Sequence, residues 1–389
     1  MAVVYRRLLA DRPFAAGVGS VALSAVALGM IPLSLILSSG ESLVAGAFAA
    51  GVFGLANAVG VPIQGALMAR IPARWVVGTS TGVSCVFMLV VAAAPGSVAQ
   101  PVFLAGAGVS FPALAAALRA SIPRLFSEPE ERSGAYALLS VAFQAGLAVG
   151  PVAASLLATS ATRRLSFVIV AAVIAAAGFL LAFSTDRTGP LIRSRSRSSL
   201  PLAGVATFGR LLAIGGLVSM ATGSLTVIVP AVAYAVGRQG LAGPVLAALA
   251  LGEAVGALVF GARPVLGSRR AQLITALALT AIGYAALSLV TDQLALVAVL
   301  VFIAGALSSP VTILLSAALD DVVPQRMIAS AYGLIVVAAV GGAALGTSWA
   351  GLIVGSSAGA AGAAIVATIG VAVAAALAVP RFKSRTKSQ

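Results

Sequence analysis

Histidine is absent from this 389-residue sequence, and cysteine occurs once, at Cys85. Without histidine the chain has no imidazole proton relay, no histidine metal ligand and no Ser-His pair. A single cysteine cannot form an internal disulfide. The Gly-x-x-x-x-Gly-Lys-Ser/Thr phosphate loop is also missing, so the chain lacks the motif with which P-loop proteins hydrolyse ATP. These absences argue against an enzyme, and we expect no metal and no cofactor.

Charge is scarce as well. Only 9% of the residues are charged and 60% are hydrophobic, whereas a soluble domain carries roughly 25% charged residues. The net charge of +14 would point to nucleic acid in a soluble protein. Here almost every charge lies in a short segment between apolar runs, where basic residues orient a membrane protein. We therefore expect a lipid bilayer as the surroundings and no nucleic-acid partner.

The uncharged runs predict the membrane spans, since a helix needs about 20 apolar residues to cross a bilayer. They occupy 13–40, 42–69, 75–118, 133–162, 165–185, 211–237, about 243–262 with Glu253 inside, 271–291, 293–319 and 327–380. Two runs, 75–118 and 327–380, are too long for one crossing. They can fold back at Pro95-Gly96-Ser97 and at Gly355-Ser356-Ser357. The sequence thus predicts an all-α membrane protein with twelve transmembrane helices.

The basic residues predict the orientation. With a cytoplasmic N-terminus, all 24 Lys and Arg residues fall on the cytoplasmic side except Arg163, Arg164 and Arg238. Both termini are therefore expected in the cytoplasm. The abundance of Arg, Ala and Gly over Lys favours a bacterial source, so we expect a multi-pass protein of the bacterial cytoplasmic (inner) membrane.

The longest polar segment, 186–208, divides the chain into an N-terminal six-helix bundle, 1–185, and a C-terminal one, 209–389, that ends in a basic tail. Its Arg/Ser run, 193–199, could bind RNA or anionic lipid, but a solvated linker is the simpler interpretation. The halves match each other at an offset of 196 residues: Gly146 and Gly150 correspond to Gly342 and Gly346, Ala135-Tyr136 to Ala331-Tyr332, and Gly65 to Gly261. Parallel repeats of this kind place a substrate site between the halves at mid-membrane.

Two motifs carry a resemblance to a known family. Gly65-Ala66-Leu67-Met68-Ala69-Arg70-Ile71-Pro72-Ala73-Arg74, after the second span, is similar to the Gly-x-Leu-Ala-Asp-Arg-x-Gly-Arg-Arg/Lys loop of the major facilitator superfamily, with Ala69 and Pro72 as departures. A weaker copy, with Arg269 and Arg270, follows Gly261. Gly146-x-x-x-Gly150-Pro151 in the fifth span resembles the Gly-x-x-x-Gly-Pro motif of antiporter branches, although Ala153-Ala154 replaces the usual Gly-Gly.

The resemblance covers essentially the whole chain and implies the major facilitator fold of two pseudo-symmetric bundles. It assigns gating to the loop residues Gly65, Arg70, Arg74, Arg269 and Arg270, and it implies export by antiport. Drug-type antiporters usually carry an Arg within the fourth helix; here that helix has no charge before Arg119, near its cytoplasmic end.

Glu253 is the only acidic residue inside a predicted span, where an acid costs on the order of 2.5–3.5 kcal/mol to insert. One interpretation is that it carries a proton or contacts a cationic substrate. The other is that a protonated Glu253 hydrogen-bonds across a helix interface beside Gly252 and Gly256. At the 196-residue offset its counterpart is Asn57, another polar group at mid-span.

Further polar side chains at depth are predicted to line a cavity. They are Gln64, Gln144, Ser219, Thr222 and Ser308. Gln144, two turns before Gly150-Pro151, is the strongest of them, because Ser and Thr in spans more often bond their own backbone. Pro112 and Pro310 can kink helices that line the cavity.

Together these features predict a secondary active transporter that exports a small, moderately hydrophobic compound by proton antiport and works as a monomer. The alternative is an importer or facilitator for a sugar or amino acid without proton coupling. A permease subunit of an ATP-driven importer and a transporter-like receptor or lipid-handling protein also stay open.

Overall fold

The computed structural model describes residues 2–39, 42–94, 97–158, 163–184, 202–261, 268–323 and 328–379, and the regular structure within these ranges is helical. A short helix, α1 (Ala2–Ala10), precedes the N-terminal bundle. The bundle comprises α2 (Arg12–Ser38), α3 (Leu43–Met68), α4 (Ala73–Ala93), α5 (Gln100–Ser110), α6 (Leu114–Leu125), α7 (Pro129–Ala158) and α8 (Arg163–Ser184). The C-terminal bundle comprises α9 (Leu202–Ala235), the 3-10 turn η1 (Gln239–Leu241), α10 (Ala242–Gly261), α11 (Arg269–Ser288), α12 (Leu294–Val322), α13 (Ile328–Val354) and α14 (Gly359–Ala378).

Twelve segments of the described chain are long and apolar enough to cross a membrane, when α5 and α6 are counted as one crossing. The predicted number of spans is therefore confirmed. One expected reversal lies between α13 and α14, where Gly359 has a φ of +57°, a conformation that glycine adopts without a steric penalty. The other lies between α4 and α5; Pro95 and Gly96 themselves are outside the described residues.

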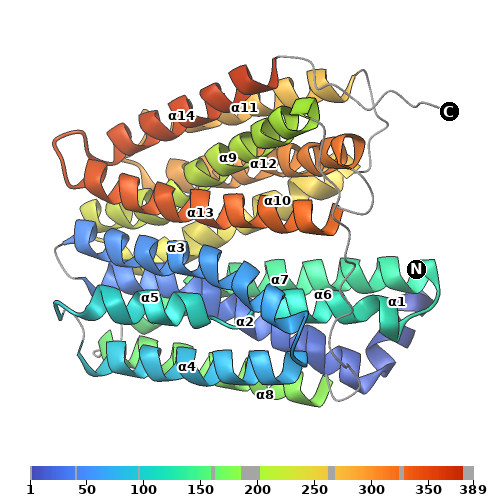
Figure 1. Cartoon of the computed structure of the whole chain (residues 1–389). Coiled ribbons are helices and arrows are strands. Elements are labelled where there is room, and N and C mark those ends of the chain that lie inside the picture. The colour runs from blue at the N-terminus through green and yellow to red at the C-terminus, as the bar shows by residue number, and fades with distance from the viewer. Residues whose placement is uncertain are drawn as a thin grey trace.

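The two groups of helices lie side by side in Figure 1, with α2–α8 below and α9–α14 above. The start of α2 and the end of α14 lie at the same end of the molecule. The second group starts earlier than expected, because α9 begins at Leu202 and Phe208 already packs against the buried core. The predicted linker therefore ends in helix, and its Arg/Ser run lies outside the described residues.

Glycines set the closest helix packing in the same way in both groups. In the first, a Cβ on Gly150 of α7 would lie 2.6 Å from the carbonyl oxygen of Val26 on α2. In the second, a Cβ on Gly346 of α13 would overlap the carbonyl of Met220 on α9. The glycines paired by the sequence repeat thus have the same packing role, which is to let two backbones approach closely.

The fourth span is broken. α5 ends at Ser110 and α6 begins at Leu114, as expected for a span that contains Pro112, since proline lacks an amide hydrogen and clashes with the preceding turn. Pro310, in the corresponding span of the second group, lies inside the continuous helix α12. The two prolines therefore have different local consequences.

Candidate site between the two helical bundles

The two bundles touch at the end of the molecule opposite α1, which we call the closed end. There the backbone amide of Gly243 on α10 donates a 2.6 Å hydrogen bond to Oγ of Ser155 on α7. Ser155 is 1% exposed, and a Cβ on Gly243 would overlap the carbonyl of Pro151. The start of α7 lies at the other end, because Glu131 pairs with Arg7 of α1 at 3.6 Å.

A second seam, between α3 and α13, is closed at the same end. A Cβ on Gly54 of α3 would lie 2.7 Å from Cβ of Ala344 on α13, and one on Gly51 would overlap Oγ of Ser348. Gly351 of α13 faces Ala47 in the same way. In Figure 1, α13 lies directly above α3 along this seam.

Midway along α7 and α10 a polar contact joins the bundles. Nε2 of Gln144 on α7 donates a hydrogen bond of 3.2 Å to Oε2 of Glu253 on α10, and both side chains are partly buried. The sequence singled out these two residues separately for their polarity at depth. The structure brings them together, 11 residues along α7 from the closed contact at Ser155.

Glu253 rests against α12 through glycines. Cβ atoms on Gly252 and Gly256 would overlap the carbonyls of Phe302 and Ala306, and a Cβ on Gly305 would lie 3.1 Å from the amide nitrogen of Glu253. This close packing leaves the carboxyl group directed toward the opposite bundle and Gln144.

Tyr284 of α11 is a polar neighbour that the sequence analysis missed. Tyr284 is 1% exposed, and its hydroxyl group forms a hydrogen bond with the side chain of Thr222 on α9. It is also close enough to Glu253 for the two side chains to interact electrostatically. Thr222 in turn donates to the carbonyl of Val218 at 3.2 Å. A tyrosine in an apolar run is usually interpreted as an aromatic core residue. The only sequence signal for a role in the site is its hydroxyl group, which needs a hydrogen-bond partner when it is buried.

Asn57 occupies the place on α3 that Glu253 occupies on α10. A Cβ on Gly108 of α5 would lie 3.1 Å from the amide nitrogen of Asn57, which matches the relation of Gly305 to Glu253. Asn57 is 3% exposed, and its Oδ1 has no hydrogen-bond partner among the described residues. The repeat thus places an amide in one half and an acid in the other.

Gln64 of α3 has a structural role at the break between α5 and α6. Its Nε2 donates to the carbonyls of Val109 at 3.1 Å and Phe111 at 2.8 Å, and its Oε1 accepts from the amide of Ala113 at 3.0 Å. These three backbone groups are released by the break between α5 and α6. Gln64 is 3% exposed, so it supports the break, and we do not include it in the proposed substrate contacts.

The predicted hydroxyl groups differ in their availability. Ser308 of α12 is 5% exposed, and its hydroxyl group donates to the carbonyl of Gly305 at 3.0 Å. It therefore bonds its own helix backbone, as Ser and Thr in membrane spans commonly do. Ser219 of α9 is partly buried, and its hydroxyl group has no hydrogen-bond partner in the described part of the chain.

The loop residues assigned to gating lie at the end of the molecule near α1. Arg70 is exposed, and Arg74 lies over the Trp75 ring at 5.8 Å. In the weaker copy, Arg269 and Arg270 begin α11, Nε of Arg270 has no partner among the described residues, and 262–267 are outside the described ranges. A Cβ on Gly65 would meet nothing within 4 Å, so packing does not require a glycine there.

Gly146, Gly150 and Pro151 lie on α7 against α2. Cβ atoms on the two glycines would strike the carbonyls of Ala22 and Val26, and Pro151 lies beside Gly29. The motif therefore creates a close helix pair, and it also leads directly to Ser155 at the closed end.

Comparison with known proteins identifies the family. The family model described as Major Facilitator Superfamily matches residues 13–346. The chain belongs to the major facilitator superfamily. No curated protein matches this transporter in sequence.

Solved transporters share its fold across nearly their whole length. A bacterial homologue of the human lysosomal transporter Spinster, in an inward-facing and unoccupied conformation, is 15% identical with a TM-score of 0.69, and the match covers 95% of this chain and 96% of that one. The nucleoside transporter NupG is 16% identical with a TM-score of 0.68 and coverage of 94% and 96%. A POT family transporter in complex with 5-aminolevulinic acid is 11% identical with a TM-score of 0.75 and coverage of 93% and 94%.

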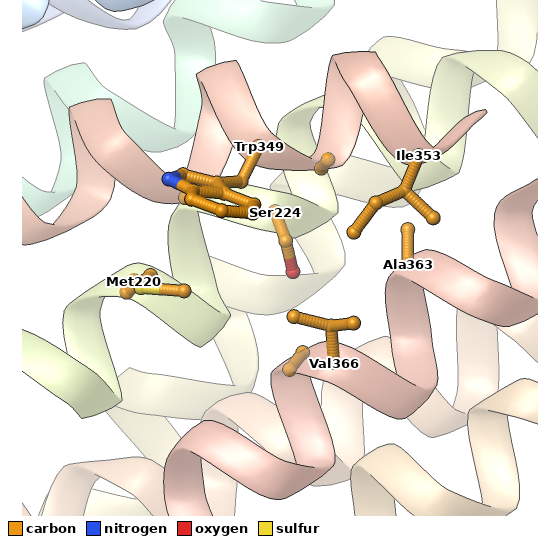
Figure 2. Close-up of a pocket in the computed structure, with 9 residues that line it drawn as sticks. Met220, Ser224, Trp349, Ile353, Ala363 and Val366 are labelled. Carbon is orange, nitrogen blue, oxygen red and sulfur yellow. The ribbon is translucent and has the colours of Figure 1, made fainter. Parts of the chain in front are cut away.

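This transporter also has a pocket away from the seams. It is a small, partly open hollow between α9, α13 and α14. In Figure 2 the side chains of Ser224, Ile353 and Val366 point toward its centre, with Trp349 above. Gly346 of the sequence repeat lines it, but Glu253, Gln144 and the other predicted cavity residues named above do not, so it is separate from the site between the bundles.

Proposed function

We propose that this major facilitator transporter exports a small, moderately hydrophobic compound by proton antiport, with Glu253 as the proton site. The observation that carries the proposal is the hydrogen bond from Gln144 to Glu253, which joins the two bundles at mid-length. An ionisable group inside the membrane needs a partner or a function, and the described side chains form no ion pair with Glu253.

A lone carboxylate inside the membrane has two ways to avoid an uncompensated charge. It can take up a proton, or it can bind a cationic group of the substrate. Because both neutralise the same oxygen atoms, they exclude each other, and release of one accompanies binding of the other. This mutual exclusion is the chemical requirement of an antiporter.

In this proposal the site is exposed to each side of the membrane in turn by rocking of the N-terminal half, 1–185, against the C-terminal half, 209–380. Both seams touch at the closed end, and the contacts at Gly243 and Gly54 must separate when that end opens. The Gln144–Glu253 bond lies between the closed end and the end near α1, so its length changes with the motion. Proton exchange at Glu253 would thereby be linked to the change of state. With cytoplasmic termini, the closed end described here faces away from the cytoplasm.

Proton movement in proteoliposomes tests the proposal. Wild-type protein is compared with Glu253→Gln while hydrophobic cations, natural-product antibiotics and sugars are supplied in turn. Glu128→Gln is the matched control, because Glu128 is an exposed acid outside the membrane spans. We expect substrate-driven proton movement in the wild type and the control and its loss in Glu253→Gln.

Substrate movement without proton movement in all three proteins would refute antiport. That result would favour a facilitator or nutrient importer, and Glu253 would then be a protonated hydrogen-bonding group in a helix interface.

A further inference from the structure

Arg119 carries a positive charge between the Gln144–Glu253 contact and the α1 end of the molecule. It lies on α6, is exposed, and donates from Nη2 to Oγ of Ser140 on α7 at 3.5 Å. No carboxylate among the described side chains lies within ion-pair distance of it. Ser140 itself is exposed and bonds back to the carbonyl of Tyr136 at 2.9 Å.

Ser140 belongs to the face of α7 that approaches α10. Ser155 meets α10 at the closed end, Gln144 reaches it at mid-length, and Ser140 follows one helical turn beyond Gln144. The α7–α10 seam is thus in direct contact at Ser155, joined by side chains at Gln144 and lined by an exposed side chain at Ser140. The guanidinium of Arg119 therefore lies near this seam, one turn beyond Gln144 toward the α1 end.

The break in the fourth span gives Arg119 this position. α6 starts a new direction at Leu114, and Gln64 holds the break through three hydrogen bonds. The corresponding helix of the second bundle, α12, is continuous, and Phe260 replaces Gln64 at the 196-residue offset. The basic group is therefore a feature of the N-terminal bundle, whereas the acid belongs to the C-terminal bundle.

We propose that Arg119 and Ser140 form a binding site for a carboxylate of the transported compound, and that the substrate is an amphoteric molecule with an apolar middle. This inference rests on the proposed function of Glu253, which would receive the amino group. Ser140 and Gln144 are one turn apart, about 6 Å along the helix axis. With side-chain reach, the two charged groups of the substrate would be separated by on the order of 10 Å.

Arginine suits this role because its planar fork matches a carboxylate in two parallel hydrogen bonds. Such a charge-assisted contact contributes roughly tenfold or more to affinity. Ser140 positions the guanidinium, because its hydroxyl oxygen accepts from Nη2 of Arg119 while its own hydrogen is donated to the carbonyl of Tyr136.

A set of alkyl compounds tests the site by changing one group at a time. Octylamine has the amine alone, aminooctanoic acid adds a carboxylate at the far end, its methyl ester removes that charge, and aminobutyric acid shortens the separation. Binding is measured as thermal stabilisation of purified protein in detergent, and transport as probe-driven proton movement in proteoliposomes.

In wild-type protein we expect aminooctanoic acid to half-saturate at a concentration roughly tenfold below those of the amine, the ester and the short acid. Arg119→Gln should remove this preference, and Arg119→Lys should retain part of it. Arg12→Gln removes an exposed charge at the same end of the molecule. In this control the preference for aminooctanoic acid should be as large as in wild-type protein.

Equal binding of the long acid and its ester to wild-type protein would overturn the proposal, as would an unchanged preference in Arg119→Gln. A lipid phosphate is the competing occupant of Arg119. If Arg119→Gln weakens all four probes equally, and only in phosphatidylglycerol and not in phosphatidylcholine vesicles, the arginine holds a headgroup and the substrate site is refuted.

The two measurements separate this inference from the function on which it rests. Absence of proton movement with every probe counts against antiport, while the stabilisation assay still decides whether Arg119 recognises the carboxylate. Proton movement that depends on Glu253 but is the same for acid and ester counts against the Arg119 site alone.

Discussion

Gln144 and Glu253 come from opposite bundles and meet at 3.2 Å, with the amide as donor and the carboxyl oxygen as acceptor. A neutral donor can bond to either the ionised or the protonated carboxyl group, but it bonds more strongly to the ionised one. Gln144 can therefore bond to Glu253 in either protonation state, and it does not fix the charge of Glu253 as an arginine would.

Gln144→Leu removes the donor and keeps the side-chain size. We expect proton movement coupled to substrate to fall about tenfold, because one hydrogen bond to a charged group contributes about 1.5–3 kcal/mol. Thermal unfolding in detergent should change little, since Gln144 is partly exposed. Gln144→Glu, which puts a second acid against Glu253, should impair coupling more severely, and an unaffected coupling ratio in both variants would remove Gln144 from the mechanism.

Gln64→Leu should destabilise the protein by about 3 kcal/mol, because it leaves three backbone groups at the helix break without partners in an environment that lacks water. Those groups are the carbonyls of Val109 and Phe111 and the amide of Ala113. Phe260→Leu, at the corresponding place beside the unbroken α12, is the control and should cost less. Denaturant unfolding followed by circular dichroism measures both; equal losses would show that the break does not depend on Gln64.

The spans could be predicted because charge is confined to the loops, and Glu253 and Gln144 could be selected because a polar group at depth is costly. Their contact could not be predicted. It depends on how α7 of one bundle crosses α10 of the other, and no local pattern specifies that crossing. The role of Gln64 was missed for a related reason: Pro112 marks a break, but the sequence does not show which side chain receives the released backbone groups.

Which end of the transporter is closed also lies beyond sequence reasoning. Both states of a rocking carrier contain the same helices with the same apolar faces, so hydropathy is identical in each. The repeat pairs Gly150 with Gly346, and the two are packed alike, because a glycine that admits a neighbouring backbone in one bundle has the same use in its copy.

Gly150→Ala should lower stability by about 1–3 kcal/mol, the usual cost of overpacking. The new Cβ would lie 2.6 Å from the carbonyl oxygen of Val26 and 2.7 Å from Cα of Gly29, and neither backbone group can rotate away. Gly78→Ala is the matched control, since its Cβ would meet nothing within 4 Å and alanine favours a helix. Thermal unfolding of the two variants should therefore shift in opposite directions.

Gly243→Ala should open the closed end. The added Cβ would overlap the carbonyl of Pro151 and crowd the hydroxyl group of Ser155, so the α7–α10 seam can accommodate it only by separating. Spin labels at Ala45 and Ser357, which are exposed at the ends of α3 and α13 there, report the separation in a Cys85→Ala background. We expect a longer distance population in Gly243→Ala than in the parent.

Ser155→Ala separates the two contributions at this contact. It removes the 2.6 Å hydrogen bond to Gly243 without adding volume, so the label distance should shift toward the longer population less than in Gly243→Ala. An unchanged distribution in Gly243→Ala would mean that the contact does not limit opening of this end. A loss of folding in that variant would be evident in its unfolding curve, and Ser155→Ala would then decide whether the contact contributes to closure.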